Sequence, residues 1–326
     1  LGAKGDGRTL DSDAINAAIE AAAEAGGGTV YLPAGEYLCF SIRLKSNIRL
    51  FIDAGATIVA ASPEEHDGGY DVDEPNPWHH EHGYQDYGHS HWKDSLIWGI
   101  GLENVTIEGP GTIYGRGLVK WDTEEPGYGN KAIALKEYRN VTLKDFTIRQ
   151  GGHFGILPTA VDNFVIDNLR IDTNRDAINI DCCKNVRISS CTLNTPNDDA
   201  IVLKSSYWLG EARITENVTI INCQVSGYDE GTLLDGTYGR TQQAAPDGGG
   251  VTGRIKFGTE SNGGFRNITI SNIVFDRCRG IALETVDGGV LEDVTISNIT
   301  MREVEGSPLF LRLGARMRGP EGVEVG

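Results

Sequence analysis

One short pattern returns along most of the chain. It begins with Asn, or once with Asp, and continues with apolar and polar residues in alternation, as in Asn104-Val105-Thr106-Ile107. This period of two is typical of a β-strand with one buried face. The seven copies begin at residues 104, 140, 163, 185, 217, 267 and 293, so their starts are 36, 23, 22, 32, 50 and 26 residues apart.

A strand that repeats every 22 residues or more, with no helical pattern between copies, favours a coil of short parallel strands. Each rung of such a coil covers the next, and free strand edges remain only at the two ends. We therefore predict an all-β fold, a right-handed single-stranded parallel β-helix, with residues 1–326 as one domain. A leucine-rich horseshoe is the competing interpretation, but the regular Leu spacing it needs is missing. The repeat Asn residues are expected to form a structural ladder of amide hydrogen bonds.

The remaining segments predict a cap and two insertions. Residues 1–45 are expected to hold the N-terminal cap and the first strands, because a helix start at Asp11-Ser12-Asp13 leads into an apolar stripe that Gly26-Gly27-Gly28 ends. Residues 62–95 and 227–253 interrupt the repeat and are expected to leave the coil as loops. Loops of this kind cluster on one face of a solenoid and often bind ligands.

Composition removes several classes of function. The formal net charge of -17 argues against nucleic acid, whose phosphates require clustered Lys and Arg. No apolar stretch approaches the roughly 20 residues that span a bilayer, so no membrane partner is expected. The six Cys residues match no CxxC pattern and are expected to be buried thiols. The His residues at 79, 80, 82, 89 and 91 lack a companion motif, so neither a metal nor a cofactor is predicted.

A set of acidic residues recurs at one phase of the repeat. Counting thirteen residues from successive repeat Asn residues reaches His153, Asp176 and Asp198, and Asp199 follows directly. Because adjacent rungs lie about 4.8 Å apart, these side chains should converge. Crowded carboxylates raise the pKa of one member and leave another ionised, which is the acid and base pair of glycoside hydrolysis. Asp also caps turns, but three in phase favour a catalytic site.

Two of these segments resemble motifs of the polygalacturonase family. Asn174-Arg175-Asp176 is similar to its N-x-D motif, and Asp198-Asp199, with the strand that follows as far as Ser205, is similar to its D-D motif. The resemblance implies an inverting glycoside hydrolase in which water displaces the leaving sugar directly. It also implies Asp176, Asp198 and Asp199 as the catalytic residues. Asp199 is our choice of general acid, although coupled carboxylates share their protons and the sequence does not order the roles.

The chain departs from the family at two further motifs. The family has G-H-G on the next rung, whereas here no His follows His153 and the matching stretch is Gly253 to Glu260. The family's R-x-K motif, which holds a substrate carboxylate, falls on Ala282-Leu283-Glu284. Loss of two cations removes the fork that grips galacturonate. We therefore expect a substrate other than plain polygalacturonan, either neutral at the cleaved linkage or similar to rhamnogalacturonan.

The residues expected to bind substrate lie in phase with the acids or on the altered motifs. Trp208 is included because aromatic faces bind the apolar faces of sugars. Arg254 and Lys256 are expected to supply the missing positive charge. Glu260 and Glu284 are expected either to take over a role of the altered motifs or to pair with Arg side chains. The full set is His153, Asn174, Lys204, Trp208, Arg254, Lys256, Glu260 and Glu284.

The leading hypothesis is a hydrolase of a pectin-related or other plant-type polysaccharide or oligosaccharide, exo-acting if the long loops close one end of the groove. A β-eliminating lyase on the same fold is an alternative, and it would need a base beside a uronate and usually a cation. A non-catalytic carbohydrate-binding β-helix is another. A monomer is expected. A secreted or periplasmic location is expected from the substrate class; no signal peptide is visible, and a removed leader would leave the same start.

Overall fold

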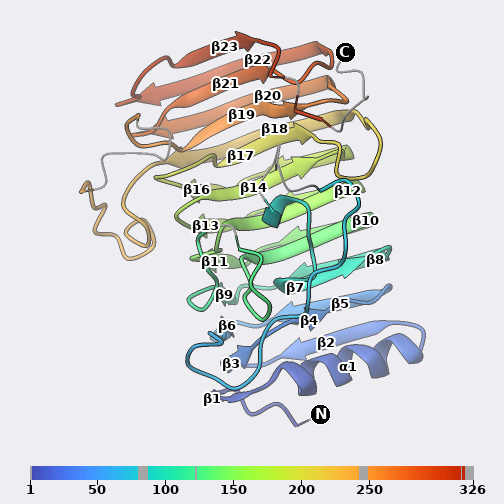
Figure 1. The fold of residues 1–326 in the computed structure, drawn as a ribbon. Coiled ribbons are helices and arrows are strands. Elements are labelled where there is room, and N and C mark those ends of the chain that lie inside the picture. Colours follow the sequence, from blue (N-terminus) through green and yellow to red (C-terminus); the bar gives the residue numbers. More distant parts are fainter. Residues whose placement is uncertain (1, 80–86, 122, 242–248, 317, 320–326) are drawn as a thin grey trace.

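The chain winds into a tall coil whose strands stack in three parallel faces. The computed structural model describes residues 2–79, 87–121, 123–241, 249–316 and 318–319. Figure 1 shows the rungs rising from the N-terminal end to the C-terminal end, and every pairing between these strands is parallel. The predicted right-handed parallel β-helix is confirmed.

Each face collects one strand from each rung. The first face holds β4 (Ile42–Arg43), β7 (Ser95–Ile100), the first parts of β10 (Lys131–Lys144) and β12 (Phe154–Asp167), β14 (Asp176–Asp181), β17 (Ile201–Ser205), β19 (Arg254–Ser261), β21 (Gly280–Thr285) and β23 (Leu309–Leu313). The second holds β2 (Gly28–Leu32), β5 (Ile48–Ile52), β8 (Glu103–Glu108), the later parts of β10 and β12, β15 (Lys184–Ser189), β18 (Thr215–Ser226), β20 (Phe265–Asp276) and β22 (Leu291–Arg302). The third holds β1 (Asp6–Leu10), β3 (Gly35–Cys39), β6 (Ala56–Ala60), β9 (Thr112–Tyr114), β11 (Thr147–Arg149), β13 (Arg170–Asp172), β16 (Thr192–Asn194) and the ends of β18, β20 and β22.

The alternating pattern of the repeat builds the interior. Parallel register places equivalent residues of successive rungs directly over one another, so one column of the core is made entirely of large aliphatic side chains. All six are fully buried: Ile107, Leu143, Ile166, Ile188, Ile220 and Ile270. Their polar neighbours point outward. Burial of such columns supplies most of the free energy that favours the coil.

The repeat Asn residues form the predicted ladder. Each Nδ2 donates to the Oδ1 of the Asn one rung below, at 2.7 to 3.1 Å, through the series Asn267, Asn217, Asn185, Asn163, Asn140, Asn104 and Asn47. Asn47 extends the ladder beyond the copies found in the sequence. These residues have φ between 53° and 63°, the left-handed region that Asn tolerates better than most residues.

The N-terminal end is closed as the sequence predicts. Helix α1 (Ser12–Glu24) lies across the first rung, and its Ile15 and Ile19 are buried against the core (Figure 1). A short 3₁₀ helix, η1 (Tyr87–His89), lies in the segment between β6 and β7. The six Cys residues are buried free thiols. No helix among the described residues has the length and apolar character of a membrane span.

Candidate active site

Three carboxylates meet on the first face, at the point where β14 and β17 begin. Ile178 is in register with Ile201, which sets Asp199 opposite Asp176 on the next rung. The backbone N–H of Asp199 donates to Oδ1 of Asp176 at 3.0 Å. One carboxylate oxygen from each of Asp176, Asp198 and Asp199 lies within 4.8 Å of the other two. The predicted convergence of the three Asp side chains is therefore present.

Cations hold one of these carboxylates in its ionised form. Nε of Arg254 lies 2.6 Å from Oδ1 of Asp199, and Nζ of Lys256 lies 3.3 Å from its Oδ2. Burial alone would raise the pKa of Asp199, but the charges of Arg254 and Lys256 outweigh it, so this pKa lies below its usual value. Asp199 is therefore an anion across the ordinary pH range.

The neighbouring carboxyl is shifted in the opposite direction. Burial raises the pKa of Asp176 well above its usual value, and the charge of Asp198 raises it further. Lys204, whose Nζ lies 3.8 Å from Oδ2 of Asp176, offsets part of this rise. A hydrogen bond with Asp198 also raises the pKa of Asp176. Asp198 also accepts a hydrogen bond from Nη2 of Arg175 at 2.8 Å.

Two further acids complete the charge network around the cluster. Lys204 lies 3.5 Å from Oε2 of Glu260, and Lys256 lies 3.5 Å from Oε2 of Glu284. Burial would raise the pKa of Glu260, but Lys204 and the other nearby cations lower it to about 2. Each of the two Lys residues thus bridges one Asp of the cluster and one Glu of a later strand.

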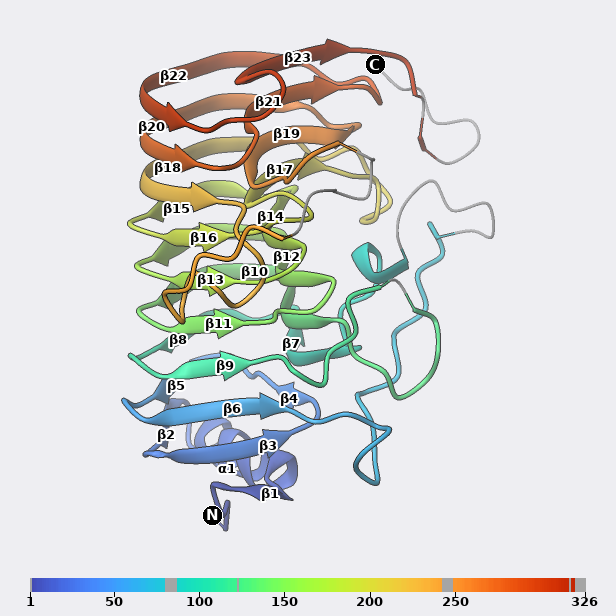
Figure 2. The same cartoon turned by 90° about the vertical axis from the view of Figure 1, so that its left-hand side faces the viewer.

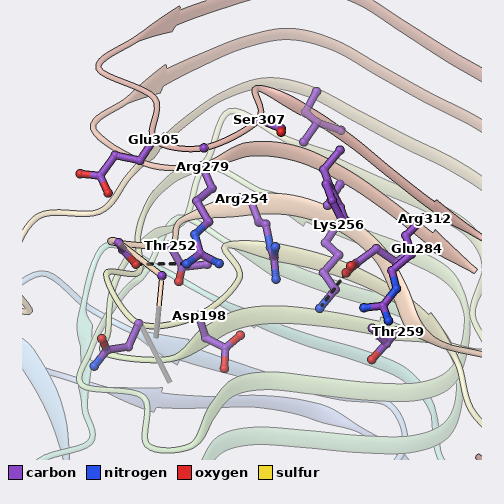
Figure 3. Close-up of a pocket in the computed structure, with 17 residues that line it drawn as sticks. Asp198, Thr252, Arg254, Lys256, Thr259, Arg279, Glu284, Glu305, Ser307 and Arg312 are labelled. Atoms are coloured by element: carbon purple, nitrogen blue, oxygen red, sulfur yellow. Dashed lines mark hydrogen bonds and ion pairs between the residues drawn. The ribbon is translucent and has the colours of Figure 1, made fainter. Parts of the chain in front are cut away.

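A pocket of about 680 Å³ opens over this network (Figure 3). Asp198, Arg254, Lys256 and Glu284 lie in its lining, and Figure 3 shows the Asp198 carboxylate below the cations of β19. The opposite wall comes from β23 and the segment before it, which contribute Glu305, Ser307, Phe310 and Arg312. Asp198 is the one member of the acid cluster in this lining, since Asp176 and Asp199 are buried behind it.

The expectation that His153 faces the substrate is wrong. Four residues separate β11 from β12, whereas three separate β13 from β14, so the count slips by one and Phe154, not His153, is in register with Asp176. A slip of one residue reverses the direction of a side chain. His153 is buried, with Nδ1 3.1 Å from the carbonyl oxygen of Lys120 and its ring against Phe154.

Trp208 is not a sugar platform either. It is 1% exposed, and its Nε1–H donates to Nδ1 of His89 at 3.3 Å. Asn174, Lys204 and Glu260 are also outside the described pocket lining. Oδ1 of Asn174 accepts a hydrogen bond from Asn197 at 3.1 Å, and Lys204 and Glu260 lie in the buried charge network. These residues shape the site from behind its surface.

The insertion between β6 and β7 covers the first face next to the acid cluster. Nε2 of His89 lies 3.1 Å from Oδ2 of Asp181, and the Trp92 indole donates to Oγ1 of Thr159 at 3.2 Å. Both partners are outward-facing residues of the first face, and His89 and Trp92 are buried. Figure 2 shows this segment projecting from the side of the coil. His80 and His82 of the predicted His cluster lie outside the described residues.

Among the described residues, the carboxylate oxygens of Asp176, Asp198 and Asp199 lie close enough together to hold a cation. However, the side chains around them already supply positive charge. Arg175, Lys204, Arg254 and Lys256 all lie within 4 Å of a carboxylate oxygen of the cluster. Four cations beside three carboxylates leave little attraction for a metal ion. The arrangement therefore fits proton transfer better than metal binding.

Sequence reasoning missed several residues of the site. Arg175 was read only as the variable position of a motif, although it pairs with Asp198. Phe310 and Arg312 were not selected, although both line the pocket. The alternation in Leu309-Phe310-Leu311-Arg312-Leu313 carries the signal, because Phe and Arg share the face that the three Leu residues do not.

Comparison with known proteins supports the β-helix fold. Residues 1–124 match the family model described as rhamnogalacturonase A/epimerase, pectate lyase-like, and residues 103–242 match the right-handed β-helix region. A probable polygalacturonase of Vitis vinifera is 25% identical over 94% of this chain, and the chain spans 60% of the length of that relative. Over 20% of the chain, alginate lyase 7 of Azotobacter vinelandii is 55% identical, which covers 8% of that protein.

Solved structures share the fold of this chain. The exopolygalacturonase of Thermotoga maritima superposes on 96% of this chain and 80% of its own, with a TM-score of 0.66 and 21% identity. Similarity at this level of identity shows a shared fold. Together, the three-faced coil and the match to the β-helix family model identify the chain as a right-handed parallel β-helix protein, similar in sequence to a probable polygalacturonase.

Proposed function

We propose that the chain is a glycoside hydrolase of pectin-related or other plant-type polysaccharides and oligosaccharides. The observation that supports this most strongly is the division of charge within the acid cluster. Burial and the charge of Asp198 raise the pKa of Asp176, while Arg254 and Lys256 outweigh burial at Asp199 and lower its pKa. Hydrolysis of a glycosidic bond needs this combination of a protonated acid and a carboxylate base.

The geometry favours Asp198 as the general acid, in place of the Asp199 expected from the sequence. Asp198 lines the pocket beside Asp176, the carboxyl whose pKa is raised, whereas Asp199 is buried and has a lowered pKa. In the proposed reaction the proton held on Asp176 passes through Asp198 to the glycosidic oxygen as its bond to the anomeric carbon breaks. Water attacks that carbon and gives its proton to Asp199, so one bond is broken, one is formed and the charges balance.

Direct attack by water with inversion is proposed over a covalent intermediate. The carboxylate oxygens lie within 4.8 Å, closer than the roughly 6.5–9.5 Å of most inverting enzymes. However, both oxygens of Asp199 already contact cations, Oδ1 with Arg254 and Oδ2 with Lys256. The burial of Asp199 behind Asp198 limits its access to an anomeric carbon, which favours a water molecule as the attacking group.

Exo action on a substrate other than plain polygalacturonan is also proposed. The insertion anchored through His89 covers the first face beside the cluster, which supports a groove closed at that end. Ala282 and Glu284 stand in the pocket where two cations would grip a galacturonate carboxylate. A secreted or periplasmic location is proposed from the class of substrate, and a monomer is also proposed.

A β-eliminating lyase is less well supported, for a reason the sequence did not show. The site is rich in cations. Burial would lower the pKa of Lys256, but the charge of Asp199 outweighs burial and raises this pKa. Lys256 therefore keeps its proton and is a poor base for proton abstraction. A lyase would release an unsaturated product with near-ultraviolet absorbance, which a hydrolase does not.

The proposal is tested by the release of reducing ends from pectic and hemicellulosic polysaccharides. Asp198→Asn, Asp199→Asn and Asp176→Asn should each lower kcat by at least about 10³-fold, while the matched control Glu305→Gln, an acid on the far wall of the same pocket, should keep most activity. Thermal unfolding confirms that each variant is folded. Wild-type binding without turnover would support the non-catalytic β-helix, and full activity of Asp198→Asn would exclude the proposed acid.

A further inference from the structure

The register between β17 and β19 is interrupted beside the acid cluster. Between Leu203 and Ser205 the pairing shifts, so that Lys204 alone on β17 lies opposite residues 258–260 on β19. Additional residues in one of two paired strands form a β-bulge, which bends the strand and redirects its side chains. The bulge, residues 258–260, is therefore expected to aim one of its side chains at Lys204.

The bulge turns Glu260 toward Lys204. Its first residue, Gly258, has a φ of 84°, and a Cβ atom there would overlap a backbone carbonyl oxygen of β21, so only glycine fits. Its second residue, Thr259, accepts a hydrogen bond at Oγ1 from Nη1 of Arg316 at 2.8 Å. With these two residues fixed, Oε2 of Glu260 lies 3.5 Å from Nζ of Lys204.

Lys204 lies between two carboxyl groups. Its Nζ is 3.5 Å from Oε2 of Glu260 and 3.8 Å from Oδ2 of Asp176, and all three residues are buried. Little water screens charges at such positions, so each charge acts strongly on the next. Oε2 of Glu260 has no hydrogen-bond partner among the described residues, so the nearby cations are what balance its charge. An ammonium shared with Glu260 stabilises the Asp176 anion less than one paired with Asp176 alone.

The other charges around these two carboxyls differ in sign. Burial and two neighbouring acids raise the pKa of Asp176, whereas the charge of Lys204 lowers it. Burial would also raise the pKa of Glu260, and Lys204 is the first of the groups that lower it to about 2. The other titratable groups that face the two carboxyls from adjacent elements are Asp198 and Asp199 at Asp176, and His89, Lys256 and Arg316 at Glu260. Lys204 therefore links a carboxyl that holds its proton to one that does not.

We infer that Glu260 is a positioning residue that draws the ammonium of Lys204 away from Asp176 and so keeps a proton on the Asp176 carboxyl. If Glu260 were neutral, the ammonium would pair with Asp176 alone and favour its anion. When the proton passes from Asp176 through Asp198 to the leaving oxygen, the same ammonium stands 3.8 Å away and stabilises the anion that remains. This inference rests on the proposed function and names the residue that regulates when its acid is loaded.

The titration of Asp176 tests this inference without a substrate. Carbon-13 NMR of protein labelled at the Asp carboxyl carbons follows each Asp through its pKa, and the signal missing from Asp176→Asn identifies Asp176. In Glu260→Gln we expect the titration of Asp176 to move to lower pH, because Lys204 is released to it. In Lys204→Met the titration should move to higher pH, and adding Glu260→Gln to that variant should shift it less than Glu260→Gln does alone.

Two further variants complete the experiment. Glu260→Asp retains the charge but shortens its reach to Lys204, so it should move the titration in the same direction by a smaller amount, and it tests the inference if Glu260→Gln fails to fold. Glu216→Gln removes the acid of the Lys184–Glu216 ion pair on the second face and should leave the titration in place. An Asp176 titration that stays in place or moves to higher pH in the folded Glu260 variants, or an equal shift with and without Lys204, would overturn the inference.

The activity of the same variants separates this inference from the proposed function. The alkaline limb of the kcat/KM profile should follow the Asp176 titration to lower pH in Glu260→Gln. The expected titrations without any hydrolysis would count against the proposed function alone, whereas hydrolysis with an unmoved titration would count against the role of Glu260 alone.

Discussion

Asp176 and Asp199 share a hydrogen bond from the backbone N–H of Asp199 to Oδ1 of Asp176, yet the pKa values of their carboxyls move in opposite directions. The difference in pKa comes from the charged residues on the strands next to each Asp. Asp199 is adjacent to β19, which supplies Arg254 and Lys256, whereas Asp176 has Asp198 as its closest charged neighbour. Two acids one rung apart can therefore take different roles because the coil gives each a different neighbour.

Lys204 should set the alkaline limit of activity. It lowers the pKa of Asp176, which burial and Asp198 raise, so Lys204→Met should raise that pKa further. Asp176 must hold a proton in the proposed reaction, and activity is therefore lost as pH rises through its pKa. We expect the alkaline limb of the kcat/KM profile to move to higher pH in the variant. The control Lys184→Met removes an ion pair with Glu216 on the second face, and it should leave the limb in place. A limb that stays fixed or moves down in Lys204→Met would contradict this role.

Glu260 should contribute stability that disappears in acid. Its pKa is lowered from 4.5 to about 2, so the contribution is complete above its unfolded pKa and is lost as pH falls from about 4.5 toward 2. A shift of this size corresponds to at most about 3 kcal/mol. In Glu260→Gln, the free energy of unfolding should therefore fall less steeply between pH 5 and pH 3 than in the wild type, as measured by urea titration. Glu305→Gln, on the exposed rim, serves as the control; equal slopes for wild type and Glu260→Gln would disprove the contribution.

His89 should fasten the insertion to the coil. It is 1% exposed and contacts Asp181 and Trp208, which are also buried. His89→Ala would leave the Asp181 carboxylate without one partner and open a cavity, at a cost of about 3 kcal/mol. We expect a lower Tm and faster proteolysis within residues 62–94. His66→Ala changes a half-buried His of the same insertion and should alter neither the Tm nor the rate of proteolysis. An unchanged Tm and an unchanged rate of proteolysis in His89→Ala would show that other contacts hold the insertion to the coil.

The architecture was predictable because it depends on a local and repeated signal. The Asn that opens each strand and the alternation after it are visible in the sequence, and both act between neighbouring rungs. The ladder and the buried aliphatic columns follow from that repetition. Asn47 was missed although Ile48-Arg49-Leu50 has the same alternation as Val186-Arg187-Ile188 in the copy at residue 185.

The site was predictable only where the repeat length stays constant. Asp176, Asp198 and Asp199 converge as counted, but the additional residue between β11 and β12 displaces His153 from the same phase. The prediction that Trp208 binds sugar was wrong for a different reason, because the insertion that buries Trp208 begins more than a hundred residues earlier in the sequence. Arg254 and Lys256 were selected from the altered G-H-G stretch, and the pairing of β19 with β17 across the long insertion places both of them beside Asp199.

The anomeric configuration of the first product tests the central claim most directly. Proton NMR would follow hydrolysis of the preferred substrate from the panel by the wild type and by Asp198→Asn, before mutarotation mixes the anomers. We predict a product of inverted configuration from the wild type and at least about a 10³-fold slower reaction from the variant. A product of retained configuration, an unsaturated product, or an undiminished rate in Asp198→Asn would contradict water-mediated hydrolysis by this acid cluster.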